Sequence, residues 1–466
     1  MPPVPHPHPQ LDPARMVSSG LCIGCGGCVA EAADDDAHMA WNRYGQRVPS
    51  GDRGPLRGGP AAFARICPFS PEARNEDELA AARFAAAPHL DPGIGRFEAA
   101  YVGHAAEDGF RAAGSSGGMV TWVAAELLRR GLVDGVAHVV PTDRHADGGL
   151  FRYRISRSGA EVRAGARSRY YPVDLADVLA EIRAVPGRYA VVGIPCFIKA
   201  VHLLAREDGL IRERVAFTLG LFCGHMKSTR FVDSIAWQMG IAPEQVEAVE
   251  YRVKTPDRPA NWYRAELALA DGGRPQRDWW HLVDGDWGSG FFQNPACNFC
   301  DDVTAETADI AFGDAWVEPY SSDGRGTNVV VVRSPVLHDL VREAVAAGRL
   351  ALDPVDAAFV TNTQAAGFRQ RREGLAFRLA VLAPKLRPRK RVAPDVAIPL
   401  RRRLIYRARH GISAWSHRMF WLAVKARAPR LYLGWGRLAV AIYHGLAYSR
   451  GPIGRLVDRI APRGDA

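Results

Sequence analysis

The sequence has no stretch of 18 consecutive apolar residues, so a conventional membrane-spanning helix is not expected. Its first twenty residues are rich in proline and lack the apolar core of a signal peptide, which predicts an intracellular, cytoplasmic chain. No internal repeat recurs at the period of a solenoid. Of the 466 residues, 47% are hydrophobic and 24% are charged. These ordinary values exclude global disorder and favour a globular protein of about three domains.

Acidic residues are scarce near the C-terminus. From Lys385 onward the chain has 19 Lys and Arg but only three Asp, whereas residues 1–384 carry 41 basic and 47 acidic side chains. Aromatic residues are interleaved with these arginines, so we expect two or three amphipathic helices. Three interpretations are open: a solvated extension, a nucleic-acid surface and a peripheral anchor on an anionic membrane. The sequence has no recognised nucleic-acid module, and Arg-rich faces beside aromatic ones favour the membrane anchor, with no nucleic-acid partner.

The eight cysteines divide into two sets of four, and an intracellular chain is not expected to use them as a disulfide framework. In the first set, Cys22, Cys25 and Cys28 recur every three residues in a glycine-rich loop, which lets three thiolates converge on one cubane. Cys67, followed by Pro68, is the expected fourth ligand. Zinc is the alternative, but it favours two separated cysteine pairs. The pattern therefore predicts a [4Fe–4S] cluster.

The second set lacks such a run. It consists of Cys196, Cys223, Cys297 and Cys300, of which only the last two form a CxxC motif. This motif alone fits zinc, a redox dithiol or a cluster. Cys196 follows an apolar strand, where a buried loop would present it. If the three segments converge, four thiolates are available for a second cluster; zinc and unliganded core cysteines are the alternatives.

Two further features indicate a binding pocket. Residues 114–118 read Gly-Ser-Ser-Gly-Gly between an expected strand and the start of an expected helix, where exposed amides bind phosphate well. Capping of that helix by the two serines is the alternative. An acidic residue at the end of an apolar strand, as at Asp314, commonly orients a ligand or caps a helix. The candidate cofactor-binding residues are Arg111, Ser115, Ser116, Gly117, Gly118, Gly313 and Asp314.

Basic side chains flank the loops of the second cysteine set. Lys199, His202, His225 and Lys227 lie there. A lone His or Lys in such a place is more often structural or solvated than catalytic, because few such groups touch a reacting atom. We take His225 and Lys227 as the candidate proton donors.

In their order along the chain, these motifs resemble the coenzyme F420 hydrogenase/dehydrogenase β-subunit family. The resemblance spans roughly residues 20–335. It rests on the CxxCxxC run with its later Cys-Pro, the SSGG turn, a GxPC loop, the Phe222-Cys-Gly-His225 segment and a CxxC followed by Asp309-Ile-Ala-Phe-Gly-Asp314. The resemblance implies FAD and two [4Fe–4S] clusters, stacked for electron transfer. It also implies that the SSGG turn and Gly313-Asp314 belong to the flavin pocket. Segments at 67–78 and 370–374 resemble a bacterial branch associated with surface-polysaccharide assembly.

The expected fold is mixed α/β, since short apolar strands alternate with periodic helical segments through the middle of the chain. It would comprise a small ferredoxin-like cluster domain, a central α/β flavin domain and C-terminal basic amphipathic helices. The expected boundaries are 1–20 for a disordered lead-in, 21–95 for the ferredoxin-like domain, 96–340 for the flavin and iron–sulfur domain, 341–384 for a helical extension and 385–466 for the basic tail.

Together these expectations describe a flavin- and iron–sulfur-dependent reductase, with ferredoxin, a nicotinamide or a reduced deazaflavin as electron donor. A lipid-linked sugar is the candidate substrate, and it would account for a redox enzyme at the inner face of the cytoplasmic membrane. The alternative is an electron-transfer β subunit that serves a separate catalytic partner, such as a coenzyme F420-dependent hydrogenase or dehydrogenase. A zinc-stabilised binding protein is the third hypothesis.

Overall fold

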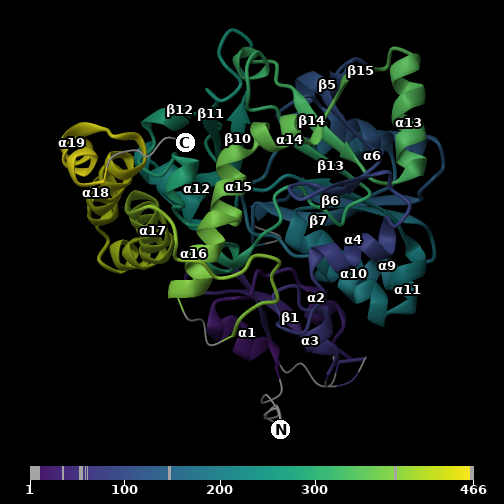
Figure 1. Cartoon of the computed structure of the whole chain (residues 1–466), viewed down its shortest axis with the longest axis horizontal. Coiled ribbons are helices and arrows are strands. Elements are labelled where there is room, and N and C mark those ends of the chain that lie inside the picture. The colour runs from purple at the N-terminus through teal and green to yellow at the C-terminus, as the bar shows by residue number, and fades with distance from the viewer. Residues whose placement is uncertain are drawn as a thin grey trace.

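The structure is a computed structural model that describes residues 11–33, 36–51, 56–57, 59, 61–144, 148–382 and 386–461. Figure 1 shows a large central sheet, with the N-terminal segment below it and three C-terminal helices along one side. Helices and strands alternate through most of the chain, which confirms the predicted mixed α/β class.

The central sheet has eight strands in the order β15-β5-β14-β13-β9-β8-β6-β7. Its middle strands β13, β9, β8 and β6 run parallel, and the flanking pairs are antiparallel. The parallel strands are buried runs of Val, Ala and Gly, as is typical of a sheet covered on both faces. The strands are β5 (Ala99–Ala105), β6 (Gly135–Pro141), β7 (Phe151–Ser156), β8 (Tyr189–Gly193), β9 (Val215–Leu221), β13 (Ile310–Asp314), β14 (Asn328–Val332) and β15 (Leu350–Val355).

Different helices cover the two faces of this sheet. Along β8, Ala190 and Val192 pack into one core cluster and Val191 into another, because successive side chains of a strand point to opposite faces. The helices on the first face are α5 (Phe110–Ala113), α6 (Met119–Arg129), α8 (Gly159–Ala164) and α13 (Pro335–Ala346). Those on the second face are α9 (Ala176–Ala184), α10 (Pro195–Glu207) and α11 (Gly209–Arg214).

The N-terminal segment packs against the second face. The core side chains of residues 11–69 join those of α9 and α10 in one cluster, while Leu79 packs with Leu203 of α10 and Phe97 with strands of the central sheet. The segment therefore has no separate hydrophobic core. Its helices are α1 (Pro13–Ser19), α2 (Gly27–Ala30), α3 (Ala62–Ile66) and α4 (Glu76–Arg83), and its strands are β1 (His38–Trp41), β2 (Arg47–Ser50), β3 (His89–Asp91) and β4 (Gly95–Phe97). The pairing of β1 with β2 confirms the predicted hairpin.

A small second sheet joins the body to the C-terminal helices. Strands β10 (Val246–Val253), β11 (Arg264–Leu269) and β12 (Gln276–Asp278) pair in that order, and α12 (Arg230–Gln238) shares a core cluster with β10 and β11. The same cluster includes buried residues of the last helices. The last helices of the chain are α14 (Ala357–Thr363), α15 (Ala365–Arg371), α16 (Glu373–Val381), α17 (Leu400–Lys425), α18 (Pro429–Tyr448) and α19 (Gly451–Ile460). Of these, α16, α17 and α18 contribute buried residues to the cluster.

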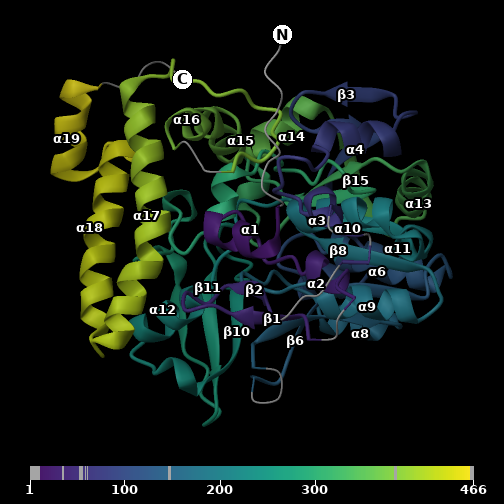
Figure 2. The same ribbon diagram turned by 90° about the horizontal axis from the view of Figure 1, so that it is seen from below.

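The basic C-terminal segment is therefore integrated into the fold over its first two helices. Figure 2 shows α17 and α18 side by side as a long helical pair at the edge of the molecule. Phe420 and Tyr432 are buried against Phe292 of the body: Tyr432 stacks on its ring and Phe420 meets it edge to face. No helix among the described residues is both long enough and apolar enough to cross a bilayer.

Three local expectations need correction or refinement. Residues 13–19 of the predicted lead-in form α1, whose Met16 is buried, while 1–10 lie outside the described residues. The alanine- and acid-rich sequence after Cys67 predicts a helix over 71–95, but the helix is confined to α4, since β3 and β4 follow it. Residues 350–355, expected to be helical, form the edge strand β15, because the flanking turn lets them pair with β5.

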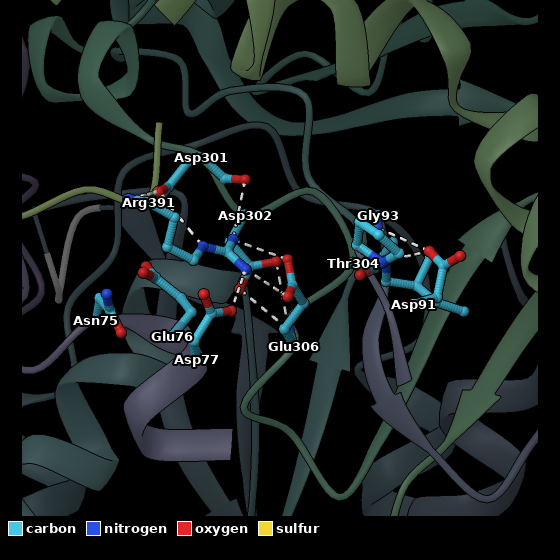
Figure 3. Close-up of polar contacts among 12 residues, drawn as sticks. Asn75, Glu76, Asp77, Asp91, Gly93, Asp301, Asp302, Thr304, Glu306 and Arg391 are labelled. Carbon is cyan, nitrogen blue, oxygen red and sulfur yellow. Dashed lines mark hydrogen bonds and ion pairs between the residues drawn. The ribbon is translucent and has the colours of Figure 1, made fainter. Parts of the chain in front are cut away.

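A buried ion network ties four distant segments together. Lys199 of α10 lies 3.2 Å from Glu76 of α4, and Lys390 contacts both Glu76 and Asp301. Arg391 bonds both carboxylate oxygens of Glu306, at 2.6 and 2.8 Å. Figure 3 shows this guanidinium among the carboxylates of Asp77, Asp301 and Glu306. The segment after α16 is thereby clamped to the N-terminal segment and to the loop that follows Cys300.

We expect Arg391→Met to lower the free energy of unfolding by about 3–5 kcal/mol, because it removes the closest cation of the buried Glu306 carboxylate and leaves Asp301 with Lys390 alone. Denaturant unfolding measures this loss. Arg389→Met is the matched control: its ion pair with Glu78 is solvent-exposed, so it should cost at most about 1 kcal/mol. Equal losses in the two variants would contradict the role given to the network.

Candidate functional site: two thiol sets and a cationic cleft

The first cysteine set lies between the N-terminal loop and α3. Cys28 sits in α2, and Cys67 ends α3. Gly24 and Gly26 adopt positive φ, and a Cβ on Gly24 would come within 2.5 Å of the Arg47 carbonyl oxygen, so the loop around Cys25 can close only with glycine there. The Cys25 carbonyl accepts a hydrogen bond from the Leu175 amide, which fixes this loop to the start of α9.

Cys67, although distant in sequence, lies near the loop cysteines of the first set. Cys67 lies close enough to Cys25 and Cys22 for their charges to act on its thiol. Cys25, Cys28 and Cys67 also pack against the same core cluster. The distant Cys67 therefore joins the loop cysteines in space.

The second set is assembled at the ends of adjacent strands. Cys196 lies in the first turn of α10, directly after β8, and Cys223 follows β9. Because β8 and β9 are parallel neighbours, their carboxyl ends present both thiols at one edge of the sheet. The CxxC pair lies at a short 3-10 helix, Pro295–Phe299, which comes alongside because the Cys223 amide donates to the Val303 carbonyl.

The other three thiols of the second set lie near Cys196. Cys196 is affected by Cys300, Cys223 and Cys297, and also by Cys25 of the first set. The two sets are therefore neighbours that adjoin at Cys196. The sequence expectation placed Cys196 in a loop; the structure places it on a helix, because α10 begins immediately at Pro195.

Burial keeps the thiols of Cys25, Cys223 and Cys297 protonated in the protein alone. Desolvation raises the pKa of Cys25 and of Cys297 to about 11 and that of Cys223 to about 12. Metal ions and clusters bind the thiolate form, so ionisation here requires positive charge at the centre of each set. None of the eight cysteines, all within the described residues, forms a disulfide.

The residues around the second set fit an anionic thiolate cluster. Arg371 is 3% exposed, and its charge acts on Cys300, Cys223 and Cys297. Its Nε and Nη1 atoms are buried without a hydrogen-bond partner, which is costly unless an acceptor is bound. Within the described residues, no three His, Cys, Asp or Glu side chains are grouped tightly enough for a single metal ion. A four-iron cluster is bulkier than one ion, and its sulfurs would accept the free Arg371 donors.

A second feature is a cationic cleft beside the glycine-rich turn. It is lined by Ser115, Arg252, Lys254, Tyr263 and Gly326, among others. The Lys254 Nζ donates to the carbonyls of Arg111 and Ser116, at 2.6 and 2.7 Å. Burial, with the nearby charges of Arg252 and Arg111, lowers the pKa of Lys254 to about 7. A cleft with this excess of positive charge suits a phosphate-bearing ligand.

Of the predicted pocket residues, Ser115 lines this cleft, and Arg111, Ser116 and Asp314 bond to residues that line it. Arg111 bonds the Gly326 carbonyl and pairs with Asp323, and the Ser116 hydroxyl donates to the Thr327 carbonyl. Ser115 accepts a hydrogen bond from the Ser168 amide. Neither serine caps α6, whose N-cap is Gly118 at positive φ, so the capping alternative is wrong.

Gly117 of the turn and Gly313 of β13 lie where neighbouring atoms leave no room for a side chain. A Cβ on Gly117 would meet the Gly103 carbonyl at 2.7 Å, and one on Gly313 would meet the Phe222 ring at 2.1 Å. Asp314 forms a two-pronged ion pair with Arg252, at 2.9 and 3.2 Å. Asp314 therefore orients a cleft arginine.

The predicted proton donors lie away from the cleft, beneath α17. The His225 ring stacks on Trp287, with centroids 4.2 Å apart, and its Nε2 has no hydrogen-bond partner. Lys227 donates to the Phe291 carbonyl at 2.6 Å and lies over the rings of Phe231 and Trp287. Their role as proton donors stays a prediction.

Aromatic rings connect the cleft with the second thiol set. Tyr263 of the cleft packs on Trp279 at 4.9 Å, Trp279 lies 6.1 Å from Trp287, and Trp287 stacks on His225. His225 is two residues from Cys223. Gly224 makes this stacking possible, since a Cβ there would meet the Trp287 ring at 2.2 Å.

Family profiles of the coenzyme F420 hydrogenase/dehydrogenase β subunit match the chain in two parts. The N-terminal profile matches residues 100–180 and the C-terminal profile residues 187–358, together more than half of the chain. The chain belongs to this family. The β-subunit match includes the central sheet, the cleft and the second cysteine set. Family membership makes the chain an oxidoreductase-associated subunit, and iron–sulfur and FAD binding fit the family.

Among solved structures, a chain of the F420-reducing [NiFe] hydrogenase complex from Methanosarcina barkeri is similar. The two share 17% identity, and the likeness covers 65% of this chain and 99% of that one with a TM-score of 0.49. No curated protein matches the chain.

Sequence reasoning missed the main cations around the thiols and the cleft. Arg371 and Lys254 carry no motif, and Arg252 follows an unremarkable strand pattern. Their proximity to Cys223 and Ser115 arises from contacts across more than a hundred residues, which residue spacing does not encode. Arg371 belongs to the segment Arg369-Gln-Arg-Arg372, and this cluster of charge on a helix was the available signal.

We expect Cys300→Ser to lower the iron content of anaerobically purified protein from about eight to about four atoms per chain, because it removes a ligand of one of two clusters. Iron and sulfide analysis with EPR measures the change. Cys22→Ser should remove the other cluster and its EPR signal. A full two-cluster spectrum in Cys300→Ser would contradict the second assignment.

Proposed function

We propose that this chain is an iron–sulfur flavoprotein that passes electrons through two [4Fe–4S] clusters to FAD, and from there to a substrate or coenzyme. The observation that carries the proposal is that the two thiol sets, a series of aromatic rings and the cationic cleft adjoin one another. Cys196 adjoins both thiol sets, and the rings of Trp287, Trp279 and Tyr263 lead from the second set to the cationic cleft. These features form one path through the protein.

When bound, clusters transfer single electrons and a flavin collects two for delivery as a hydride equivalent. The chain's own residues would bind these groups and shield them from water. The eight cysteines would supply the thiolates, and the cleft cations Lys254, Arg252 and Arg111 would hold the FAD phosphates beside Ser115. The aromatic residues between the cleft and Cys223, of which Trp279 is buried and Tyr263 and Trp287 are half-buried, would limit the access of water to the path.

A substrate at a membrane is part of the proposal. Between Leu400 and Ala461 the chain has 13 Lys and Arg and one acidic residue, Asp458, which pairs with Arg401. The same helices expose large apolar side chains: Trp415, Leu422, Leu438, Ile442, Leu456 and Ile460. Apolar and cationic groups on one surface suit an anionic leaflet, with a lipid-linked sugar as substrate.

The docking surface proposed here is narrower than the whole basic tail. Lys390 and Arg391 are buried in ion pairs with Asp301 and Glu306, so they contribute nothing to a membrane contact. The surface is formed by the exposed sides of α17, α18 and α19.

An electron-transfer β subunit that serves a separate catalytic partner is the second candidate, and family membership favours it. Anaerobic purification followed by analysis of iron, sulfide, zinc and flavin tests the common core of both. About eight irons and one FAD per chain support it, and zinc without flavin contradicts it. Turnover of substrate by the isolated chain distinguishes the enzyme from the subunit. The electron donor in this assay is an artificial donor, ferredoxin, a nicotinamide or a deazaflavin.

We expect FAD affinity to fall as pH rises above about 7. Lys254 has a lowered pKa of about 7 in the free protein, and a bound phosphate favours its charged form, so binding takes up a proton above that pH. Lys254→Met should bind FAD about 10–100-fold more weakly at pH 6, through loss of a charge-assisted hydrogen bond. Flavin fluorescence titration at pH 6, 7 and 8 measures both effects.

Lys254→Arg is the control for this titration. Arginine stays charged throughout the range, so its affinity should not decline between pH 6 and 8. An equal decline in Lys254→Arg and in the wild type would show that another group controls binding.

We expect Leu438→Glu combined with Leu456→Glu to weaken binding to phosphatidylglycerol-containing vesicles by at least about tenfold, because two apolar side chains no longer enter the bilayer interface. Vesicle co-sedimentation measures this. Leu90→Glu, which changes an exposed leucine on β3, should bind as the wild type does. Binding unaffected by the double substitution, or equal on vesicles of neutral lipid, would contradict the membrane surface.

A further inference from the structure

Three buried arginines surround the second cysteine set without a carboxylate partner. Arg371, Arg378 and Arg409 are 3%, 4% and 6% exposed. The ion pairs among the described residues include none of them. An uncompensated buried charge is strongly unfavourable, so their charge requires an anion close by.

Neutral acceptors hold each of these side chains in place. The Arg371 Nη2 donates to the carbonyls of Cys223 and Gly224, both at 2.8 Å. The Arg378 Nε donates to the Asn298 carbonyl, inside the CxxC motif, at 2.8 Å. These bonds fix the guanidinium groups. Asp302 lies near Arg371 and Asp286 near Arg409, but no carboxylate among the described residues forms an ion pair with any of the three arginines. Arg371 acts on three thiols of the set, Arg378 on Cys300 and Arg409 on Cys297.

The charges around the first cysteine set differ. Asp174 lies near Cys25, and Arg47 pairs with it at 2.9 Å. Lys199 lies near Cys67, and Glu76 pairs with it. Each charge close to the first set is therefore compensated by a partner, whereas the arginines around the second set are not.

We infer that Arg371, supported by Arg378 and Arg409, is a positioning residue that raises the reduction potential of the cluster at Cys196, Cys223, Cys297 and Cys300 above that of the cluster at Cys22, Cys25, Cys28 and Cys67. This inference rests on the proposed function. Reduction adds negative charge, which adjacent cations and N–H donors to sulfur stabilise. Electrons would then move from the first set to the second and on toward the cleft.

The transfer itself is a one-electron exchange. The first cluster loses one electron and the second gains it, and no bond forms or breaks. An external one-electron donor of low potential re-reduces the first cluster. In the experiment below, dithionite supplies that electron.

The test is an EPR-monitored redox titration of the anaerobically purified full-length protein. Cys22→Ser and Cys300→Ser first assign each EPR signal to its set. Arg371→Gln removes the charge and the two unpartnered donors. At a fixed solution potential we expect the reduced-to-oxidised ratio of the second cluster to fall at least about tenfold, which corresponds to about 59 mV for one electron. The potential of the first cluster should stay unchanged.

Arg369→Gln is the matched control. It removes the same charge from the same helix, but Arg369 is solvent-exposed. It should leave both midpoint potentials as in the wild type. Iron and sulfide contents are measured for every variant, which separates a shifted potential from a lost cluster.

Each outcome decides the inference. A second cluster with the lower wild-type potential, or an unchanged potential in Arg371→Gln, overturns it. If Arg371→Gln loses iron, Arg371→Lys takes its place: the charge stays and the planar donors are lost, so a smaller decrease is expected and no decrease overturns the inference. If Cys300→Ser changes neither iron nor EPR signal in the wild-type background, the cluster assignment of the proposed function fails instead, and the inference with it.

Discussion

The buried ion network around Glu76, Asp301 and Arg391 is the constraint on which the rest of the arrangement depends. It joins α4, α10, the loop after Cys300 and the segment after α16, none of which are neighbours in sequence. Removing these groups from water is costly, and the cost is recovered only when all partners are present together. The network therefore holds the N-terminal thiol set against the body, where Cys25 and Cys196 become neighbours.

The same low-dielectric interior shapes the chemistry of the site. Burial disfavours ionised thiols, so the raised pKa values of Cys223 and Cys297 mean that the sulfurs ionise only around a positively charged centre. It equally disfavours the unpaired cations of Arg371, Arg378 and Arg409, which then need the net negative charge of a thiolate-bound cluster. The two penalties compensate each other when the cluster is bound.

The C-terminal helices combine a structural and a surface role. The inner side of α17 buries Ser416, His417 and Phe420 against the body, and Arg409 reaches Gln293 beside the second thiol set. Their outer sides expose the arginines and apolar residues proposed to meet a membrane. One helical pair thus completes the environment of the thiols and faces outward from the molecule.

Much of the fold and of the donor set follows from local sequence. Apolar strands alternating with periodic helical segments predicted the mixed α/β class, and cysteine spacing predicted the first set of four thiols, because these patterns are properties of neighbouring residues. Only the tertiary structure decided that Lys390 and Arg391 are interior groups, that Arg371 faces three thiols, and that aromatic rings connect the cleft with Cys223. The electrostatic energy of a charged side chain depends on its partners and its burial, and both are determined by segments far away in the chain.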